Sequence, residues 1–171
     1  MTATAAVSLL VTGGLLGMDV RICAPAALQP AAGIQAIATG LAASSGARMT
    51  VTADLAEAVA GADYLYTDVW LSMGEPPGEW DDRIDRLLPY QVNAEAMAAT
   101  GNPAVKFMHC LPALHNTETE LGQQIYDKRG LAALEVTEEV FESPASIVFD
   151  QAENRLHTIK AVMVATIGET E

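Results

Sequence analysis

Two short stretches of the sequence bring together side chains that could do chemistry. In the first, residues 109–112 (HCLP), an imidazole and a thiol stand side by side. A thiol beside a histidine can act as a nucleophile, a metal ligand or a polar contact to a substrate. The alternative is a buried cysteine beside a histidine whose hydrogen bonds are satisfied. Only His109, Cys110 and His115 cluster, and no Cys-x-x-Cys pair exists, so the sequence does not predict a zinc site.

The second stretch, residues 68–75 (DVWLSMGE), carries a carboxylate, a hydroxyl and a thioether around a glycine. Asp68 could hold an ammonium group, and Trp70 and Met73 could line an alkyl chain. The alternative is a surface turn with Trp70 in the core. The chemistry that this stretch favours is the binding of an aliphatic amine.

A third group of polar side chains lies in residues 151–158 (QAENRLHT), which contain Glu153, Arg155 and His157. Solvated charges on a helix explain such a pattern. An arginine in this position also suits the oxygens of a phosphate or a carbonyl group.

Alternating strand and helix patterns predict the framework that must position these groups. Strands are expected at 18–23, 48–51, 62–67, 105–108 and 134–136, and helices at 3–16, 30–45, 52–60, 93–100 and 146–167. Such alternation is typical of crossovers in a parallel sheet. The sequence therefore predicts an α/β fold, a mainly parallel sheet flanked by helices, in one domain over residues 1–171.

The candidate loops come directly after two of the expected strands. Residues 68–80 follow the third strand, and residues 109–116 follow the fourth. Ligands of open parallel sheets bind beyond the carboxyl ends of the strands. We therefore expect Asp68 and Cys110 to lie at neighbouring strand ends and to share one site.

Composition excludes several classes of protein. Nine Lys and Arg against 22 Asp and Glu give a net charge of −13, which repels phosphate backbones, so no nucleic-acid partner is predicted. Two cysteines, Cys23 and Cys110, are too few for a disulfide framework and fit a reducing compartment. Residues 1–17 are apolar enough to suggest a signal peptide, but the first basic residue is Arg21. A core-facing helix is expected there instead, in a cytoplasmic protein without a membrane segment.

Together these motifs resemble the second half of ornithine carbamoyltransferases. The matching residues are 68–75, 90–93 (YQVN), 100–116 with the HCLP tetrapeptide, and 135–166, and the resemblance runs from about residue 8 to residue 168. HCLP marks carbamoyltransferases as a group. The Ser-Met-Gly within residues 68–75 points to ornithine as the acceptor, over aspartate or putrescine. The expected domain is thus the Rossmann-like ornithine-binding domain of this family.

The resemblance implies an activity and a set of contacts to ornithine. The family transfers a carbamoyl group from carbamoyl phosphate to the δ-amine of L-ornithine, giving citrulline and phosphate, with no metal or organic cofactor. Carried onto this sequence, the resemblance assigns the α-ammonium of ornithine to Asp68. Ser72 and Met73 would lie on the loop that closes over ornithine, and Cys110 would help to present the δ-amine uncharged.

On the carbamoyl side, the resemblance assigns the amide nitrogen of the carbamoyl group to the Leu111 carbonyl. Arg155 would contact the oxygens of carbamoyl phosphate, and His109 would sit beside the carbamoyl site. The resemblance thus implies Cys110, Arg155 and His109 as catalytic residues.

Two features of the family have no match in the sequence. The first domain of the family carries a Ser-x-Arg-Thr-Arg phosphate-binding loop, and we expect this N-terminal domain to be absent here and the chain to be inactive alone. The asparagine that contacts ornithine in the family falls at Thr4 or its neighbour. The partner would be a homo-oligomer or the missing domain, and apolar residues from Ile159 to Ile167 should lack cover within the chain. The alternative is a non-catalytic amino-acid-binding or subunit-interaction domain.

Overall fold

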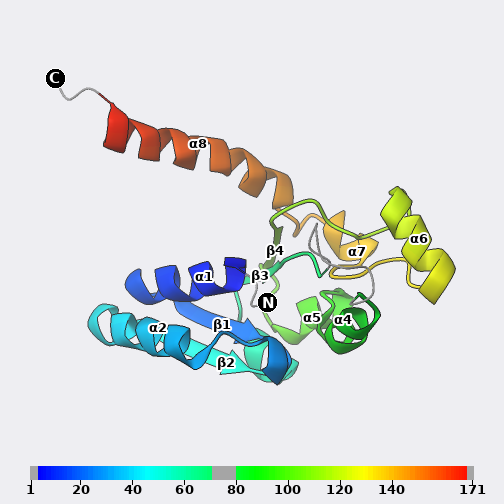
Figure 1. Ribbon diagram of the computed structural model, residues 1–171, viewed down its shortest axis with the longest axis horizontal. Coiled ribbons are helices and arrows are strands. Elements are labelled where there is room, and N and C mark those ends of the chain that lie inside the picture. The colour runs from blue at the N-terminus through cyan, green and yellow to red at the C-terminus, as the bar shows by residue number, and fades with distance from the viewer. Residues whose placement is uncertain (1–3, 71–79, 169–171) are drawn as a thin grey trace.

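A computed structural model describes residues 4–70 and 80–168. Figure 1 shows parallel strands with helices beside them and one long C-terminal helix that leaves the body of the molecule. The predicted α/β fold with parallel strands flanked by helices is confirmed. In chain order the elements are α1 (Thr4–Leu15), β1 (Asp19–Cys23), α2 (Ala32–Ser45), β2 (Arg48–Thr52), α3 (Leu55–Val59), β3 (Tyr64–Thr67), α4 (Trp80–Leu87), α5 (Ala94–Ala99), β4 (Lys106–His109), α6 (Glu120–Arg129), α7 (Glu138–Phe141) and α8 (Val148–Ile167).

The N-terminal part of the fold is built on β1 and β2, which pair in parallel with Asp19 opposite Arg48. α1 packs along α2 beside this pair (Figure 1). The two helices approach closely at Gly14, where a Cβ atom would lie 2.9 Å from the backbone oxygen of Ala38. The apolar N-terminal run therefore forms a packed helix, as the sequence predicts.

β3 and β4 form the second parallel pair, which ends with Thr67 opposite His109. Both helices expected beside this pair are present, although α3 begins at Leu55 and not at residue 52. The Asp54 and Asn93 side chains accept backbone N–H groups at the first turns of α3 and α5. The main apolar core surrounds the pair. It consists of Val59, Leu65, Val92, Val105, Phe107, Val136, Val140, Phe141 and Val148.

The sheet differs from the sequence prediction in two respects. Within the described ranges the four strands form two separate parallel pairs and not one continuous sheet. The strand expected at 134–136 is reduced to a single parallel bridge between Val92 and Val136. Backbone bonds from Val92 to Glu135 and from Thr137 to Val92 hold this bridge. Because α7 begins at Glu138, the pairing has no room to extend.

Helices α4, α6 and α7 were not predicted. α6 shows why, since among its ten residues only Gly122 and Ile125 are buried, and so narrow an apolar face gives a weak periodic signal. Its ends carry ordinary signals. The Thr119 hydroxyl accepts the N–H of Gly122 at 3.0 Å, and Gly130 closes the helix with a φ of 69°.

The last helix, α8, begins two residues later than predicted and is attached to β4 at its start. The Ile147 N–H donates to the Phe107 carbonyl, and the Phe107 N–H donates to the Ala145 carbonyl. From residue 152 to residue 168 every residue is exposed, and the helix projects away from the body (Figure 1). The expectation that the apolar residues from Ile159 to Ile167 lack cover is confirmed. None of the described helices has the length and apolarity required to span a membrane.

Candidate active site at the ends of β3 and β4

The two candidate loops meet at one point. Asp68 and Cys110 each come one residue after the last registered pair of β3 and β4. The Cys110 thiol donates to the Asp68 Oδ1 atom, with 2.8 Å between sulfur and oxygen. The Val69 N–H donates to the same oxygen at 2.8 Å. The prediction that Asp68 and Cys110 lie at neighbouring strand ends is therefore confirmed.

The environment of Cys110 favours the neutral thiol. Burial and the neighbouring Asp68 carboxylate raise the pKa of Cys110 from 9.0 to about 11. At pH 7 the sulfur is therefore protonated and donates its hydrogen to the carboxylate. A protonated thiol is a weak nucleophile, so this geometry favours a polar contact to a ligand over covalent catalysis.

Tyr66 lies one alternation step before Asp68 on the same face of β3. Its side chain is half-buried, and Cys110 and Gln151 of α8 are among the neighbours that act on its ionisation. Burial, followed by the influence of Cys110 and Asp68, raises the pKa of Tyr66 to about 12. The hydroxyl therefore stays protonated and is available as a donor at neutral pH.

His109 occupies the opposite face of β4 and is buried, with an exposed fraction of 1%. Its Nδ1 atom accepts the N–H of Leu111 at 2.9 Å, which places the proton of a neutral ring on Nε2. Nε2 lies 3.4 Å from Oε1 of Glu135, too far for a well-formed hydrogen bond. The same Oε1 accepts the N–H of Leu114 at 2.6 Å. His109 and Glu135 thus anchor the loop from residue 110 to residue 114 by accepting the N–H groups of Leu111 and Leu114.

The backbone of that loop is unusual at Leu111, whose φ is 45°. A bulky side chain rarely adopts this conformation, so surrounding contacts must hold it. The hydrogen bond to His109 is one such contact, and packing of the Leu111 side chain on the main core is another. The Leu111 carbonyl accepts no hydrogen bond from the described part of the chain, so it remains able to accept one from a ligand.

No contact in the described part of the chain brings the other predicted site residues to the Asp68–Cys110 pair. Arg155 is exposed on α8, one helical turn beyond Gln151 on the same face, and makes no ion pair with any residue described in the structure. Trp70 is buried in a second core cluster with Ile84, Ile125 and Leu134, as the alternative interpretation of its loop proposed. Ser72 and Met73 lie outside the described residues, as does the side chain of Thr4.

One group of residues near the site offers donor atoms for a cation. Atoms of His115, Glu138 and Glu142 lie within 4.8 Å of one another, but both glutamates are exposed. The His115 ring contacts the Glu138 carboxylate and stacks on Phe141 with 3.7 Å between ring centroids, and Asn116 donates to the same carboxylate. These contacts explain the group as a structural pairing without an ion.

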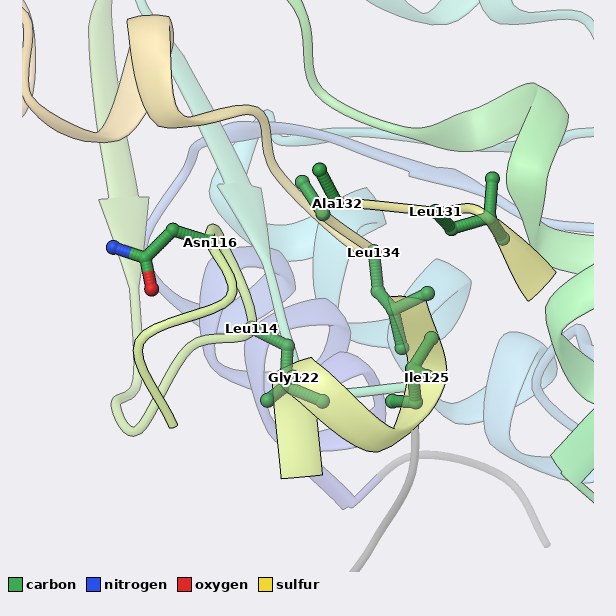
Figure 2. Close-up of a pocket in the computed structure, with 8 residues that line it drawn as sticks. Leu114, Asn116, Gly122, Ile125, Leu131, Ala132 and Leu134 are labelled. Atoms are coloured by element: carbon green, nitrogen blue, oxygen red, sulfur yellow. The ribbon is translucent and has the colours of Figure 1, made fainter. Parts of the chain in front are cut away.

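A shallow apolar depression lies beside this group and is distinct from the Asp68–Cys110 contact. Figure 2 shows the side chains of Leu114, Ile125 and Leu134 converging there, while the Asn116 amide points away. Its empty space is about 150 Å³ and opens to solvent. With no polar side chain directed into it, the depression is packing between α6 and the following loop rather than a ligand site.

Residues 2–166 match the family model described as aspartate/ornithine carbamoyltransferase, Asp/Orn binding domain. The chain belongs to this carbamoyltransferase family.

Individual carbamoyltransferases are closely similar to this chain in sequence and in structure. A catabolic ornithine carbamoyltransferase of Rhizobium meliloti is 61% identical over 163 residues, which are 95% of this chain and 49% of that protein. That of Actinobacillus pleuropneumoniae serotype 5b is 60% identical over 94% of this chain and 49% of its own length. The solved ornithine carbamoyltransferase of Pyrococcus furiosus superposes with a TM-score of 0.80 at 37% identity, covering 96% of this chain and 47% of that one. The chain thus spans about half the length of its carbamoyltransferase relatives.

The acceptor of the reaction differs among these carbamoyltransferases. A solved acetylornithine transcarbamylase, in complex with acetylcitrulline, superposes with a TM-score of 0.73 at 30% identity and covers 96% of this chain. Family membership alone therefore does not fix the acceptor, and residues such as Asp68 must be considered individually.

Three residues of the candidate site were missed from the sequence. Tyr66 could have been found, because strand alternation places it on the same face as Asp68. Glu135 and Gln151 gave no local signal. They reach the site only through packing of the segment after α6 and of the first turn of α8.

Proposed function

We propose that this carbamoyltransferase domain binds L-ornithine as the acceptor half of an ornithine carbamoyltransferase. The complete reaction converts carbamoyl phosphate and ornithine to citrulline and phosphate. The observation that carries the proposal is the 2.8 Å contact between Cys110 and Asp68, which places a carboxylate and a neutral thiol at the ends of parallel strands. Relatives of at least 60% identity that bear the name ornithine carbamoyltransferase support it.

The chemistry of the acceptor is suited to these two groups. The δ-nitrogen of ornithine must be uncharged when it attacks the carbamoyl carbon. The C–O bond to phosphate then breaks, phosphate leaves with the electron pair, and the nitrogen loses a proton. In the proposed assignment Asp68 binds the α-ammonium group, and Ser72 and Met73 close over the ligand. Cys110 contacts the δ-amine as a neutral thiol, which stabilises a charged ammonium less than a thiolate would.

The carbamoyl side of the proposed site is only partly supplied by this chain. The carbonyl of Leu111 is proposed to accept the carbamoyl N–H, and Arg155 to contact the oxygens of carbamoyl phosphate. His109 would act beside this site by holding Leu111. A departing phosphate needs several fixed cationic donors, and each donor lost costs about 100- to 1000-fold in rate. We therefore propose that the chain alone is at least ~1000-fold slower than a complete enzyme.

The proposed setting follows from the same reasoning. We propose that the chain works with the half of the family sequence that lies outside the match or within a homo-oligomer, in arginine synthesis or breakdown. A cytoplasmic location is supported by its two free cysteines, Cys23 and Cys110, which suit a reducing compartment. The catabolic relative of Rhizobium meliloti is compatible with the breakdown direction.

Calorimetric titration with ornithine tests the binding assignment. The chain should bind ornithine weakly, and Asp68→Asn should weaken binding at least tenfold, because the α-ammonium loses its charged partner. Asp63→Asn is the matched control, since Asp63 is exposed before β3 and bonds to Asn102, and it should leave binding unchanged. N-Acetylornithine, which has no α-ammonium, should bind more weakly than ornithine. Unchanged binding in Asp68→Asn would show that another carboxylate holds the ligand.

A citrulline-formation assay tests the catalytic part of the proposal. The chain is incubated with ornithine and carbamoyl phosphate, with and without the N-terminal half of the Rhizobium meliloti relative as a separate polypeptide. Turnover should be at least ~1000-fold below that of the intact relative and should rise when the second polypeptide is added. Full turnover by the chain alone would contradict the proposed division. Ornithine binding with no turnover in any mixture would identify the alternative, a non-catalytic amino-acid-binding domain.

A further inference from the structure

The position of Tyr66 gives the candidate site a feature beyond the residues assigned above. Strand alternation along β3 puts Tyr66 and Asp68 on one face, and the parallel register puts Met108 opposite Tyr66. Cys110 follows two residues after Met108 and so lies over the same face. Its thiol is fixed there by the 2.8 Å contact to Asp68. Alternation and register thus place the Tyr66 side chain and Cys110 over the same face of the strand pair.

Gln151 completes this arrangement from the first turn of α8. Its Oε1 atom accepts the His109 N–H at 3.0 Å, which fixes the orientation of the amide. The Nε2 group of the amide is then the part that can donate to the Tyr66 oxygen. A Tyr66 hydroxyl whose oxygen accepts from this amide keeps its hydrogen available to donate to Cys110.

We propose that Tyr66 is a positioning residue of the ornithine site, whose hydroxyl, held by Gln151, donates to the Cys110 sulfur and fixes it between Asp68 and α8. The role of that sulfur toward the δ-amine rests on the proposed function, but the arrangement itself does not. The Asp68 carboxylate disfavours a negative sulfur, and the Tyr66 donor favours it. The two groups therefore act on the thiol in opposite directions.

In the described part of the chain, the Val69 N–H also faces this sulfur and favours its ionised form. β3 contributes Tyr66 and, at its end, Asp68. His109 of β4 is turned toward Glu135 on the opposite face, and α8 presents the neutral Gln151, with Arg155 exposed one turn further on. Effects on the ionisation of Cys110 can thus be assigned to Tyr66 and Asp68 by substituting each in turn.

The test measures alkylation of Cys110 by iodoacetamide in a Cys23→Ser background, without ornithine, between pH 7 and pH 9.5. The rate follows the thiolate fraction and rises about tenfold per pH unit below the pKa, so a shift in ionisation displaces the whole profile. Tyr66→Phe removes only the hydroxyl and should slow alkylation about threefold to tenfold at every pH. Asp68→Asn should accelerate it, because the carboxylate is lost.

Tyr64→Phe is the matched control on the same strand, since Tyr64 is 60% exposed and further from Cys110, and it should leave the profile unchanged. Gln151→Leu should also slow alkylation. If Tyr66→Phe does not fold, the rate of Gln151→Leu decides the test. Alkylation by Tyr66→Phe at the parent rate, or faster, would overturn the proposal. Because no ornithine is present, this result is independent of the calorimetric test of ornithine binding.

Discussion

A protonated cysteine that donates to a carboxylate has a different use from a catalytic nucleophile. The burial and the Asp68 contact that raise the pKa of Cys110 to about 11 keep its sulfur neutral across the physiological range. Cys23, half-buried near Asp54 and Glu57, also has its pKa raised to about 11, mainly by burial. Each thiol has an ordinary pKa of 9.0, so the two groups link folding to alkaline pH.

The first prediction is that the free energy of unfolding falls as the pH rises from 9 to 11. Between these values the unfolded chain has lost the thiol protons that the folded chain still binds, so the unfolded state binds fewer protons and stability decreases with pH. Cys23→Ser removes one such group and should make this decrease shallower, while the pH dependence between 7 and 8 stays that of the parent. Urea unfolding at each pH measures the free energy of unfolding of the parent and of Cys23→Ser. An equally steep loss in Cys23→Ser would contradict the assignment.

The site residues divide into those that local sequence could reveal and those that packing supplies. Asp68 and Cys110 follow strand-like segments directly, so the rule for parallel sheets was enough to bring them together. His109 is adjacent to Cys110 in sequence, yet alternation turns it into the core toward Glu135. That Glu135 is buried under the loop could not be predicted, because its partner Leu114 is 21 positions away in the chain.

Among the secondary-structure elements, the segment between α6 and α7 shows how packing replaces regular structure. It contributes one bridge residue, Val136, and otherwise no strand, yet Leu134 and Val136 are almost completely buried in two different core clusters. Leu134 meets Trp70, Ile84 and Ile125, and Figure 2 shows its side chain beside Ile125. The segment is therefore held by its side chains more than by backbone pairing.

A second prediction compares two leucines of opposite exposure. Leu134→Ala should lower the free energy of unfolding by about 2–5 kcal/mol, because it removes buried contacts and leaves a cavity. Leu134 is 1% exposed, whereas Leu156 on α8 is 67% exposed. Leu156→Ala should therefore change stability by no more than about 0.5 kcal/mol. Urea unfolding of both variants measures the difference, and equal losses would show that α8 packs on the body in solution.

The elements that sequence patterns predicted well are those with apolar periodicity and clear caps. β1 to β4, α2 and α5 emerged close to their expected ranges, and Asn93 caps α5. α6 did not, since its narrow apolar face gives a weak periodic signal. α4 could have been predicted, because Trp80, Ile84 and Leu87 recur at helical spacing among charged residues. The separation of the strands into two pairs depends on how the pairs twist and pack, which no local pattern records.

For the molecule as a whole, α8 is the element without cover. Its apolar residues Leu156, Ile159, Met163 and Ile167 recur at intervals of three or four positions and so form one stripe along the helix. Each is at least 48% exposed. Contiguous apolar surface of this kind generally marks an interaction site.

A third prediction is that the isolated chain self-associates through this stripe. Leu156→Lys combined with Met163→Lys should shift sedimentation toward the monomer, because two charges on the stripe oppose its burial. Thr158→Lys combined with Ala165→Lys is the matched control, with the same charge and spacing on the opposite face of the helix, and it should leave association unchanged. A chain that sediments as a monomer at every concentration would show that the stripe does not bind a second copy.

The attachment of α8 at one end has a mechanical consequence. A helix of 20 residues is about 30 Å long, so a tilt of about 10° around its anchored start would carry the far end through about 5 Å. Gln151, three residues after the start, would move by less than about 1 Å. The start of the helix beside β4 therefore stays nearly fixed while its far end moves. A partner that covers the far end can vary in position without breaking the hydrogen bond between Gln151 and the His109 N–H. Binding at the tip and geometry around Cys110 are therefore free to change separately during evolution.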